Sequence, residues 1–80
     1  MNSQESAEMY LETILILEKK NGTVRAIDIA HYMHFARPTV SQQIKRLAAE
    51  GFLQLDINKH ISLTPKGKRI AEETYNRHNS

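Results

Sequence analysis

The 80-residue chain has no cysteine, only three glycines and two prolines, and no long hydrophobic run. Without cysteine, neither a disulfide framework nor a thiolate metal site is available. No apolar segment approaches the roughly 18 residues that a bilayer requires, and the polar start MNSQESAE is unlike a signal peptide, so we expect a cytoplasmic protein without membrane contact. The absence of a phosphate-binding glycine loop, a nucleophile elbow and a carboxylate pair argues against an enzyme.

The composition is that of one small folded domain spanning residues 1–80, with 40% apolar and 25% charged residues. The net charge is only +2, but it is unevenly distributed. The expected first helix carries four acids: Glu5, Glu8, Glu12 and Glu18. Arg25 and the stretch from Arg37 onward together carry nine cations against four acids. This asymmetry suggests a surface that faces a polyanion, although an ordinary solvated charged surface would look similar.

The apolar spacing predicts three helices in the first two thirds of the chain. Residues 4–20 contain no Gly or Pro and end at Asn21-Gly22, a typical helix stop. Their core face is expected to hold Ala7, Tyr10, Leu11, Ile14 and Leu17, with Leu15 at its edge and with Met9, Glu12 and Ile16 on the opposite side. A second helix is expected over residues 26–34, with Ile27, Ala30 and Met33 on one stripe. After a tight turn, Arg37-Pro38 begins a third helix that Gly51 ends.

The last third of the chain changes to a period of two. Alternating apolar residues predict strands over 53–57 and 61–63, joined by a two-residue turn at Asn58-Lys59. Thr64 is a favourable N-cap and Pro65 a favourable first residue for a final helix that runs to about Arg77. The fold class is therefore mainly α with a small β-hairpin, in the order of a winged helix-turn-helix.

The third helix presents polar residues on the face that its apolar residues leave free. If Val40, Ile44 and Leu47 point inward, hydrogen-bonding and apolar contact groups suited to a DNA major groove point outward over residues 38–50. The candidate DNA-binding residues are Arg25, Arg37, Pro38, Thr39, Ser41, Gln42, Gln43, Lys45, Arg46 and Lys59. In this interpretation Gln pairs with adenine and Arg with guanine, while Lys59 on the wing contacts phosphate. A merely solubilising polar face is the alternative.

Several segments resemble the N-terminal domain of the diphtheria toxin repressor and manganese transport regulator family. They are SAEMYLETILIL, RAIDIA, RPTVSQQIKRLAAEGF and ISLTPKGKRIAEE, followed by Arg77-His78, and the likeness extends from about Ser6 to His78. The resemblance implies a bacterial repressor that binds double-stranded DNA as a homodimer and uses iron or manganese as corepressor.

The resemblance also implies part of a metal site. Met9 stands where iron-type members place methionine and manganese-type members aspartate. Glu12 stands where the manganese type uses glutamate, and His78 stands on a histidine ligand common to both. Family members continue into helices that supply the remaining ligands and the dimer interface. We therefore expect the chain to be the DNA-binding portion of a longer repressor, or a shortened relative, that alone does not hold Mn²⁺ or Fe²⁺ stably.

Two other readings of the sequence remain open. His31 and His34 have a spacing that can bind zinc, although no convincing third ligand accompanies them. A protein-interaction module is the competing function, because some winged helices bind proteins and the Met9/Ile16 face could be the working surface.

Overall fold

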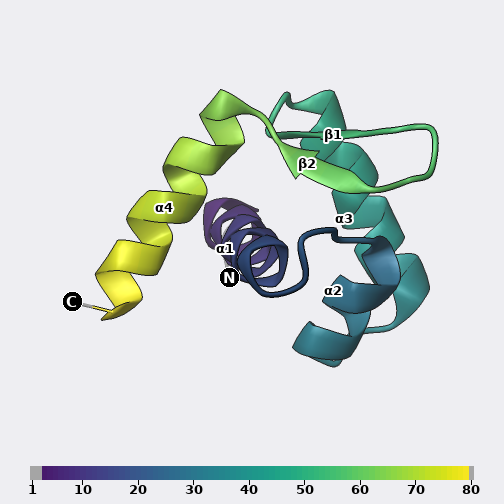
Figure 1. Ribbon diagram of the computed structural model, residues 1–80, viewed down its shortest axis with the longest axis horizontal. Coiled ribbons are helices and arrows are strands. Elements are labelled where there is room, and N and C mark those ends of the chain that lie inside the picture. The colour runs from purple at the N-terminus through teal and green to yellow at the C-terminus, as the bar shows by residue number, and fades with distance from the viewer. Residues whose placement is uncertain (1–2, 80) are drawn as a thin grey trace.

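The computed structural model describes residues 3–79, which form four helices and a two-stranded antiparallel hairpin (Figure 1). The elements follow the order α1 (Ser3–Asn21), α2 (Ala26–Met33), α3 (Arg37–Ala49), β1 (Leu53–Leu55), β2 (Ile61–Leu63) and α4 (Pro65–Asn79). This is the winged helix-turn-helix order expected from the sequence. None of the helices within residues 3–79 is both long and apolar enough to cross a membrane.

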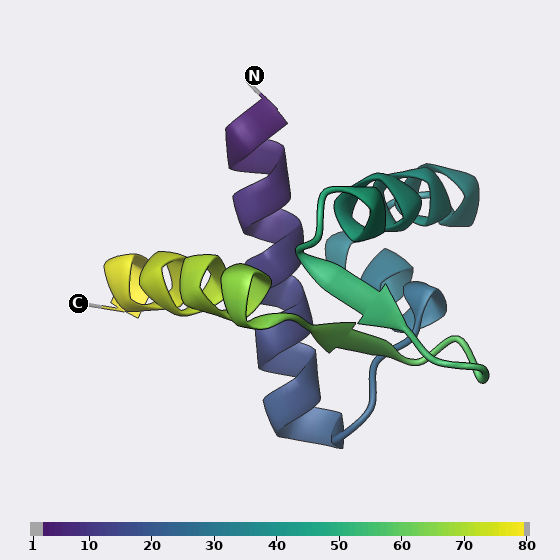
Figure 2. The same ribbon diagram turned by 90° about the horizontal axis from the view of Figure 1, so that it is seen from above.

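Helix α1 runs through the middle of the molecule, with α4 crossing it on one side and the remaining elements on the other (Figure 2). Its central position explains why its apolar face is wide. The residues it buries are Tyr10, Leu11, Ile14, Leu15 and Leu17, while Ala7 is half-buried. The buried hydroxyl of Thr13 donates to the carbonyl oxygen of Met9 at 2.8 Å, so this polar group is satisfied inside the core. The predicted core face of the first helix is confirmed, and Leu15 belongs fully to it.

Helices α2 and α3 form the helix-turn-helix. The backbone N–H of Arg25 donates to the Asp28 carboxylate at 2.9 Å, which satisfies a polar group at the start of α2. The helix ends one residue earlier than predicted, because His34 adopts a left-handed conformation with φ of 59°. On the predicted stripe Ala30 is buried and Met33 half-buried, but Ile27 is 37% exposed, and Ile29, which lies off that stripe, is buried in its place.

The β-hairpin pairs Leu53 with Leu63 and Leu55 with Ile61. The prediction of a strand that continues to residue 57 around a two-residue turn is wrong. The backbone N–H of Asp56 donates to the His60 carbonyl at 3.1 Å, and that of Lys59 donates to the Asp56 carbonyl at 2.9 Å. The loop therefore has three residues, 57–59, and Lys59 takes the left-handed conformation with φ of 64°.

Helix α4 is fixed to the base of the wing by its first turn. The hydroxyl of Thr64 accepts from the Gly67 backbone N–H at 3.2 Å and donates to the Gly51 carbonyl at 2.6 Å. The predicted N-cap is thus confirmed, and it also joins α4 to the end of α3. Further along, Ala71 and Thr74 are buried against the core. The junction at Thr64 positions both the wing and the last helix relative to α3.

Candidate nucleic-acid interface

Helix α3 separates its apolar and polar residues cleanly. Val40, Ile44 and Leu47 are buried in the core. Among the candidate DNA-binding residues on α3, Ser41 and Gln43 are half-buried. The exposed ones are Arg37, Pro38, Thr39, Gln42, Lys45 and Arg46. The division agrees with the outward and marginal positions expected from the sequence. None of these side chains takes part in a hydrogen bond or an ion pair within residues 3–79, so the donors and acceptors that they carry are available to a ligand.

The hairpin and α3 lie on the same side of α1, away from α4 (Figure 2). Lys59 is exposed at the tip of this hairpin, and Arg25 is exposed just before α2. Arg37 is exposed in the first turn of α3 itself. The structure thus places the wing next to α3, which contacts β1, and leaves the candidate cations exposed.

Asp56, one of the four acids in the basic part of the chain, is a structural residue of the wing. Its carboxylate accepts from the backbone N–H groups of Asn58 at 2.8 Å and His60 at 2.9 Å, and the His60 ring lies 3.4 Å away. These hydrogen bonds, led by that from His60, hold the pKa of Asp56 below its usual value. An Asp followed two residues later by Asn was the available signal, since Asp side chains commonly hydrogen-bond the backbone two residues on.

Lys66 is one of the cations in the basic part of the chain, but its ammonium group is engaged in contacts within the protein. It donates to the Glu50 carbonyl at 3.1 Å and lies 4.6 Å from the centroid of the Phe52 ring. The contact satisfies a carbonyl at the end of α3 and adds a cation–π interaction. Lys66 is therefore a structural cation of the α3–α4 junction.

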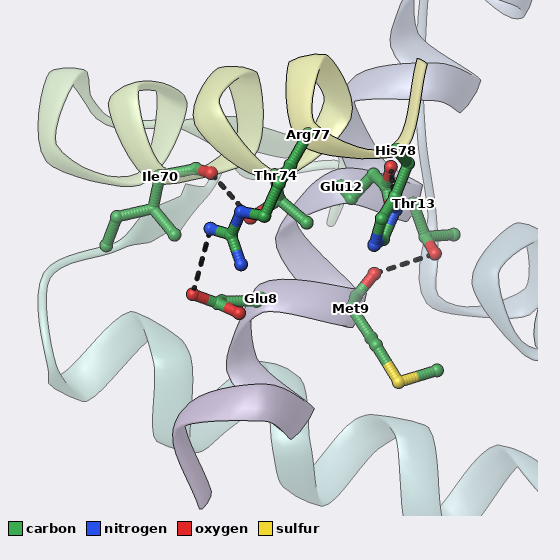
Figure 3. A network of polar contacts seen from close by, with 8 residues as sticks. All are labelled: Glu8, Met9, Glu12, Thr13, Ile70, Thr74, Arg77 and His78. Carbon is green, nitrogen blue, oxygen red and sulfur yellow. Dashed lines mark hydrogen bonds and ion pairs between the residues drawn. The ribbon is translucent and has the colours of Figure 1, made fainter. Parts of the chain in front are cut away.

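A second candidate site lies where α4 crosses α1 (Figure 3). Nδ1 of His78 lies 2.8 Å and 3.0 Å from the two carboxylate oxygens of Glu12. One turn away, the Arg77 guanidinium lies 3.5 Å from the Glu8 carboxylate. The thioether of Met9 points away from the Glu12–His78 pair in Figure 3. Two of the three residues expected at the metal site are therefore in contact, and Met9 is not directed at them.

The Glu12–His78 pair borders an open groove of about 660 Å³ between α1, α4 and the end of α2. Its apolar lining includes Met9, Tyr32 and Phe35, each with about half of its side chain exposed. Ile16, which was expected to share a patch with Met9, is half-buried and does not line the groove. The apolar surface beside Met9 is thus completed by α2 and the turn after it.

Metal-binding clusters are lacking in the part of the chain that the structure describes. No group of three or more His, Cys, Asp or Glu side chains there could hold a metal ion. His31 and His34 are both exposed at the end of α2 and gain no third partner of this kind. Structural support for a zinc site at these histidines is therefore missing.

Comparison with known proteins gives a consistent result. A family model described as "Iron dependent repressor, N-terminal DNA binding domain" matches residues 3–61. The chain is 36% identical over 75 residues to the transcriptional regulator MntR of Salmonella typhimurium, covering 94% of this chain and 48% of that protein. It is 36% identical over 74 residues to the iron-dependent repressor IdeR of Mycobacterium leprae, covering 92% of this chain and 32% of that protein.

A solved structure shows the same fold. A MarR family protein from Bacillus stearothermophilus superimposes with a TM-score of 0.69 over 86% of this chain and 51% of that chain, at 21% sequence identity. The chain spans about half the length of the MntR relative and about a third of the IdeR relative. These relatives are named as regulators and repressors, not as enzymes.

Proposed function

The chain belongs to the family of iron-dependent repressor N-terminal DNA-binding domains, and from this premise we propose that it is the DNA-reading domain of a longer, metal-dependent transcriptional repressor in the cytoplasm. The observation that carries the proposal is the two-sided α3, which buries Val40, Ile44 and Leu47 and leaves its polar residues exposed. The wing beside that face supports the same conclusion, because a helix-turn-helix reads the major groove with its second helix.

The candidate DNA-binding residues of α3, the wing and the start of α2 have two roles in this proposal, contact with bases and contact with phosphates. Gln42 and Arg46 have the groups that pair with the edges of adenine and guanine, and Pro38 and Thr39 offer apolar contact to a thymine methyl. Ser41 and Gln43, at the margins, contribute further hydrogen bonds. Arg25, Arg37, Lys45 and Lys59 carry the charge that neutralises phosphates and positions the helix.

Substitution of Arg46 tests the reading of bases. Removing a bidentate base contact should weaken binding to a preferred duplex by about 1–3 kcal/mol and relax the preference at one position. Fluorescence anisotropy with a labelled duplex selected from a random pool measures both effects. Arg69→Ala is the matched control, because Arg69 is exposed on α4, across α1 from α3. If Arg46→Ala left affinity and sequence preference unchanged, α3 would not be the reading helix.

Substitution of Lys59 tests the wing. Lys59→Ala should weaken binding to all duplexes about equally and reduce the slope of log affinity against log salt by roughly one. A loss confined to one sequence would assign a base contact, and not a phosphate contact, to Lys59.

We further propose that Glu12 and His78 hold Mn²⁺ or Fe²⁺ in the full-length protein, which acts as a homodimer on two half-sites. A carboxylate and an imidazole in contact are suitable donors for either metal, and the bound ion would act as corepressor. Donors from beyond residues 3–79 must complete the site, since this part has no cluster of three. The chain alone should therefore bind DNA independently of metal at low salt, which anisotropy with and without Mn²⁺ measures. Strictly metal-dependent binding would contradict this.

A protein-interaction module is the competing function, favoured by the exposed apolar lining of the groove at Met9, Tyr32 and Phe35. As such a module the chain would bind duplexes at most weakly and without sequence preference, and Arg46→Ala would change neither affinity nor preference. The same anisotropy titration therefore distinguishes the two functions.

A further inference from the structure

The tip of the wing carries the most exposed large apolar side chain of the described residues. Ile57 is 96% exposed, whereas Met9, Tyr32 and Phe35, which line the groove, are each only about half exposed. Ile57 lies beyond the end of β1 and outside the hydrophobic core. Its side chain therefore stabilises no packing within residues 3–79, although a polar residue would suit a solvent-exposed turn better.

The turn that presents Ile57 is held at both ends. Two backbone hydrogen bonds join Asp56 to Lys59 and His60, and the Asp56 carboxylate accepts two more from Asn58 and His60. Ile57 is the first of the three loop residues inside this set of hydrogen bonds. An apolar side chain on a braced turn loses little conformational entropy when it binds, which favours a contact made directly by the tip.

We propose that Ile57 enters the minor groove of the DNA that α3 reads, where it makes an apolar contact with the groove floor and the deoxyribose walls. The inference rests on the proposed function. Figure 2 shows the hairpin and α3 on the same side of α1. With α3 in the major groove, the wing would therefore be directed at the flanking backbone and the adjacent minor groove. Lys59 supplies a cation two residues from Ile57, and isoleucine is among the apolar residues that proteins insert into minor grooves.

The electrostatics of the tip are compatible with DNA. Asp56 is the acid nearest to Ile57 in the turn, but its carboxylate is turned to the backbone N–H groups of Asn58 and His60 and to the His60 ring. Its charge is therefore partly neutralised by local dipoles. Lys59 is exposed and has no ion-pair partner within the part of the chain that is described.

The contact can be tested with bases that differ only in the minor groove. Guanine carries a 2-amino group there, and hypoxanthine, which lacks this group, leaves the major-groove edge unchanged. Two duplexes of the same sequence, one with G·C pairs and one with I·C pairs at the flank that the wing covers, are compared by anisotropy. We expect the unsubstituted chain to prefer the I·C duplex, because its minor groove is unobstructed.

The Ile57→Ala variant should bind the I·C duplex about tenfold more weakly and lose the preference for I·C over G·C. Because an apolar contact releases no counterions, the salt slope should stay unchanged, in contrast to Lys59→Ala. Ile57→Val keeps most of the apolar surface, so its affinity for the I·C duplex should lie between those of the unsubstituted chain and Ile57→Ala. All three variants should keep the thermal midpoint of the unsubstituted chain within a few degrees, since Ile57 and Lys59 lie outside the core.

Two results would overturn the inference. If Ile57→Ala bound both duplexes as the unsubstituted chain does, the tip would make no minor-groove contact, although the proposed function would stand. If Ile57→Ala left DNA binding unchanged but abolished self-association in sedimentation, the tip would serve a contact between copies of the chain. Failure of the unsubstituted chain to bind either duplex would instead refute the proposed function itself.

Discussion

Gly67 offers a test in which local propensity and tertiary packing predict opposite signs. It is the third residue of α4, and its Cα lies against the backbone of Phe52. A Cβ at this position would overlap the Phe52 carbonyl oxygen and lie 2.8 Å from the carbonyl carbon. That oxygen already accepts from the Thr64 backbone N–H at 3.1 Å, so it cannot move away without loss of a hydrogen bond.

Helix propensity alone predicts that Gly67→Ala stabilises the protein by roughly 0.5–1 kcal/mol. The overlap with backbone should instead cost about 1–3 kcal/mol, because α4 must shift from the base of the wing. The midpoints of these two ranges leave a net loss of about 1 kcal/mol, or a fall of about 4–8 °C in the thermal midpoint for a domain of this size. Circular dichroism at 222 nm measures this midpoint.

Lys68→Ala is the control, because Lys68 is the exposed neighbour on the same helix and has nearly the same propensity as alanine. Its midpoint should change by no more than a few degrees. A Gly67→Ala variant as stable as the original chain, or more stable, would refute the close contact between α4 and Phe52.

Three further predictions follow from single contacts. Thr64→Ala should lower the free energy of unfolding by about 1–2 kcal/mol in a urea titration, because both the N-cap bond and the bond to the Gly51 carbonyl are lost; an unchanged midpoint would contradict the cap. Ile44→Ala should cost about 2–5 kcal/mol in the same assay, because it leaves a cavity beneath α3; a cost below 1 kcal/mol would contradict its burial. The lowered pKa of Asp56 means that its hydrogen bonds to the wing are fully present above the ordinary value of 3.8 and are lost as the pH falls through the lower folded-state pKa. NMR titration of the Asn58 and His60 amides should therefore show midpoints below 3.8, and a midpoint above 3.8 would contradict the assignment.

The helices could be predicted because their signals are local. Apolar spacing, the Pro at the start of α3 and the Thr64-Pro65 cap act over a few residues, and each of these features is present in the structure. The buried and exposed faces of α3 followed directly from that spacing. The errors lie where alternatives were close in free energy. On α2, Ile27 and Ile29 are both isoleucines, and the apolar spacing alone did not show that Ile29 is buried and Ile27 exposed.

The length of the first wing strand could not be predicted from the alternation of apolar and polar residues alone. Leu53, Leu55 and Ile57 fit a period of two, which suggested a longer strand, yet the backbone leaves the ladder after Leu55. The hydrogen bonds of Asp56 favour a three-residue loop, in which Lys59 takes a positive φ. Likewise, no sequence period shows that Glu12 and His78, 66 positions apart, meet where α4 crosses α1.

The groove is joined to α3, the proposed reading helix, through the end of α2. Tyr32 and Phe35, which line the groove beside Glu12 and His78, belong to the end of α2 and the turn that leads directly into α3. The Phe35 ring also contacts Tyr10 of α1, with 6.3 Å between centroids. A ligand or helix that fills this groove therefore lies against the residues that set the start of α3. Only one residue separates Phe35 from Arg37 and Pro38, with which α3 begins. The short turn that helps to line the groove is therefore also the turn from which α3 starts.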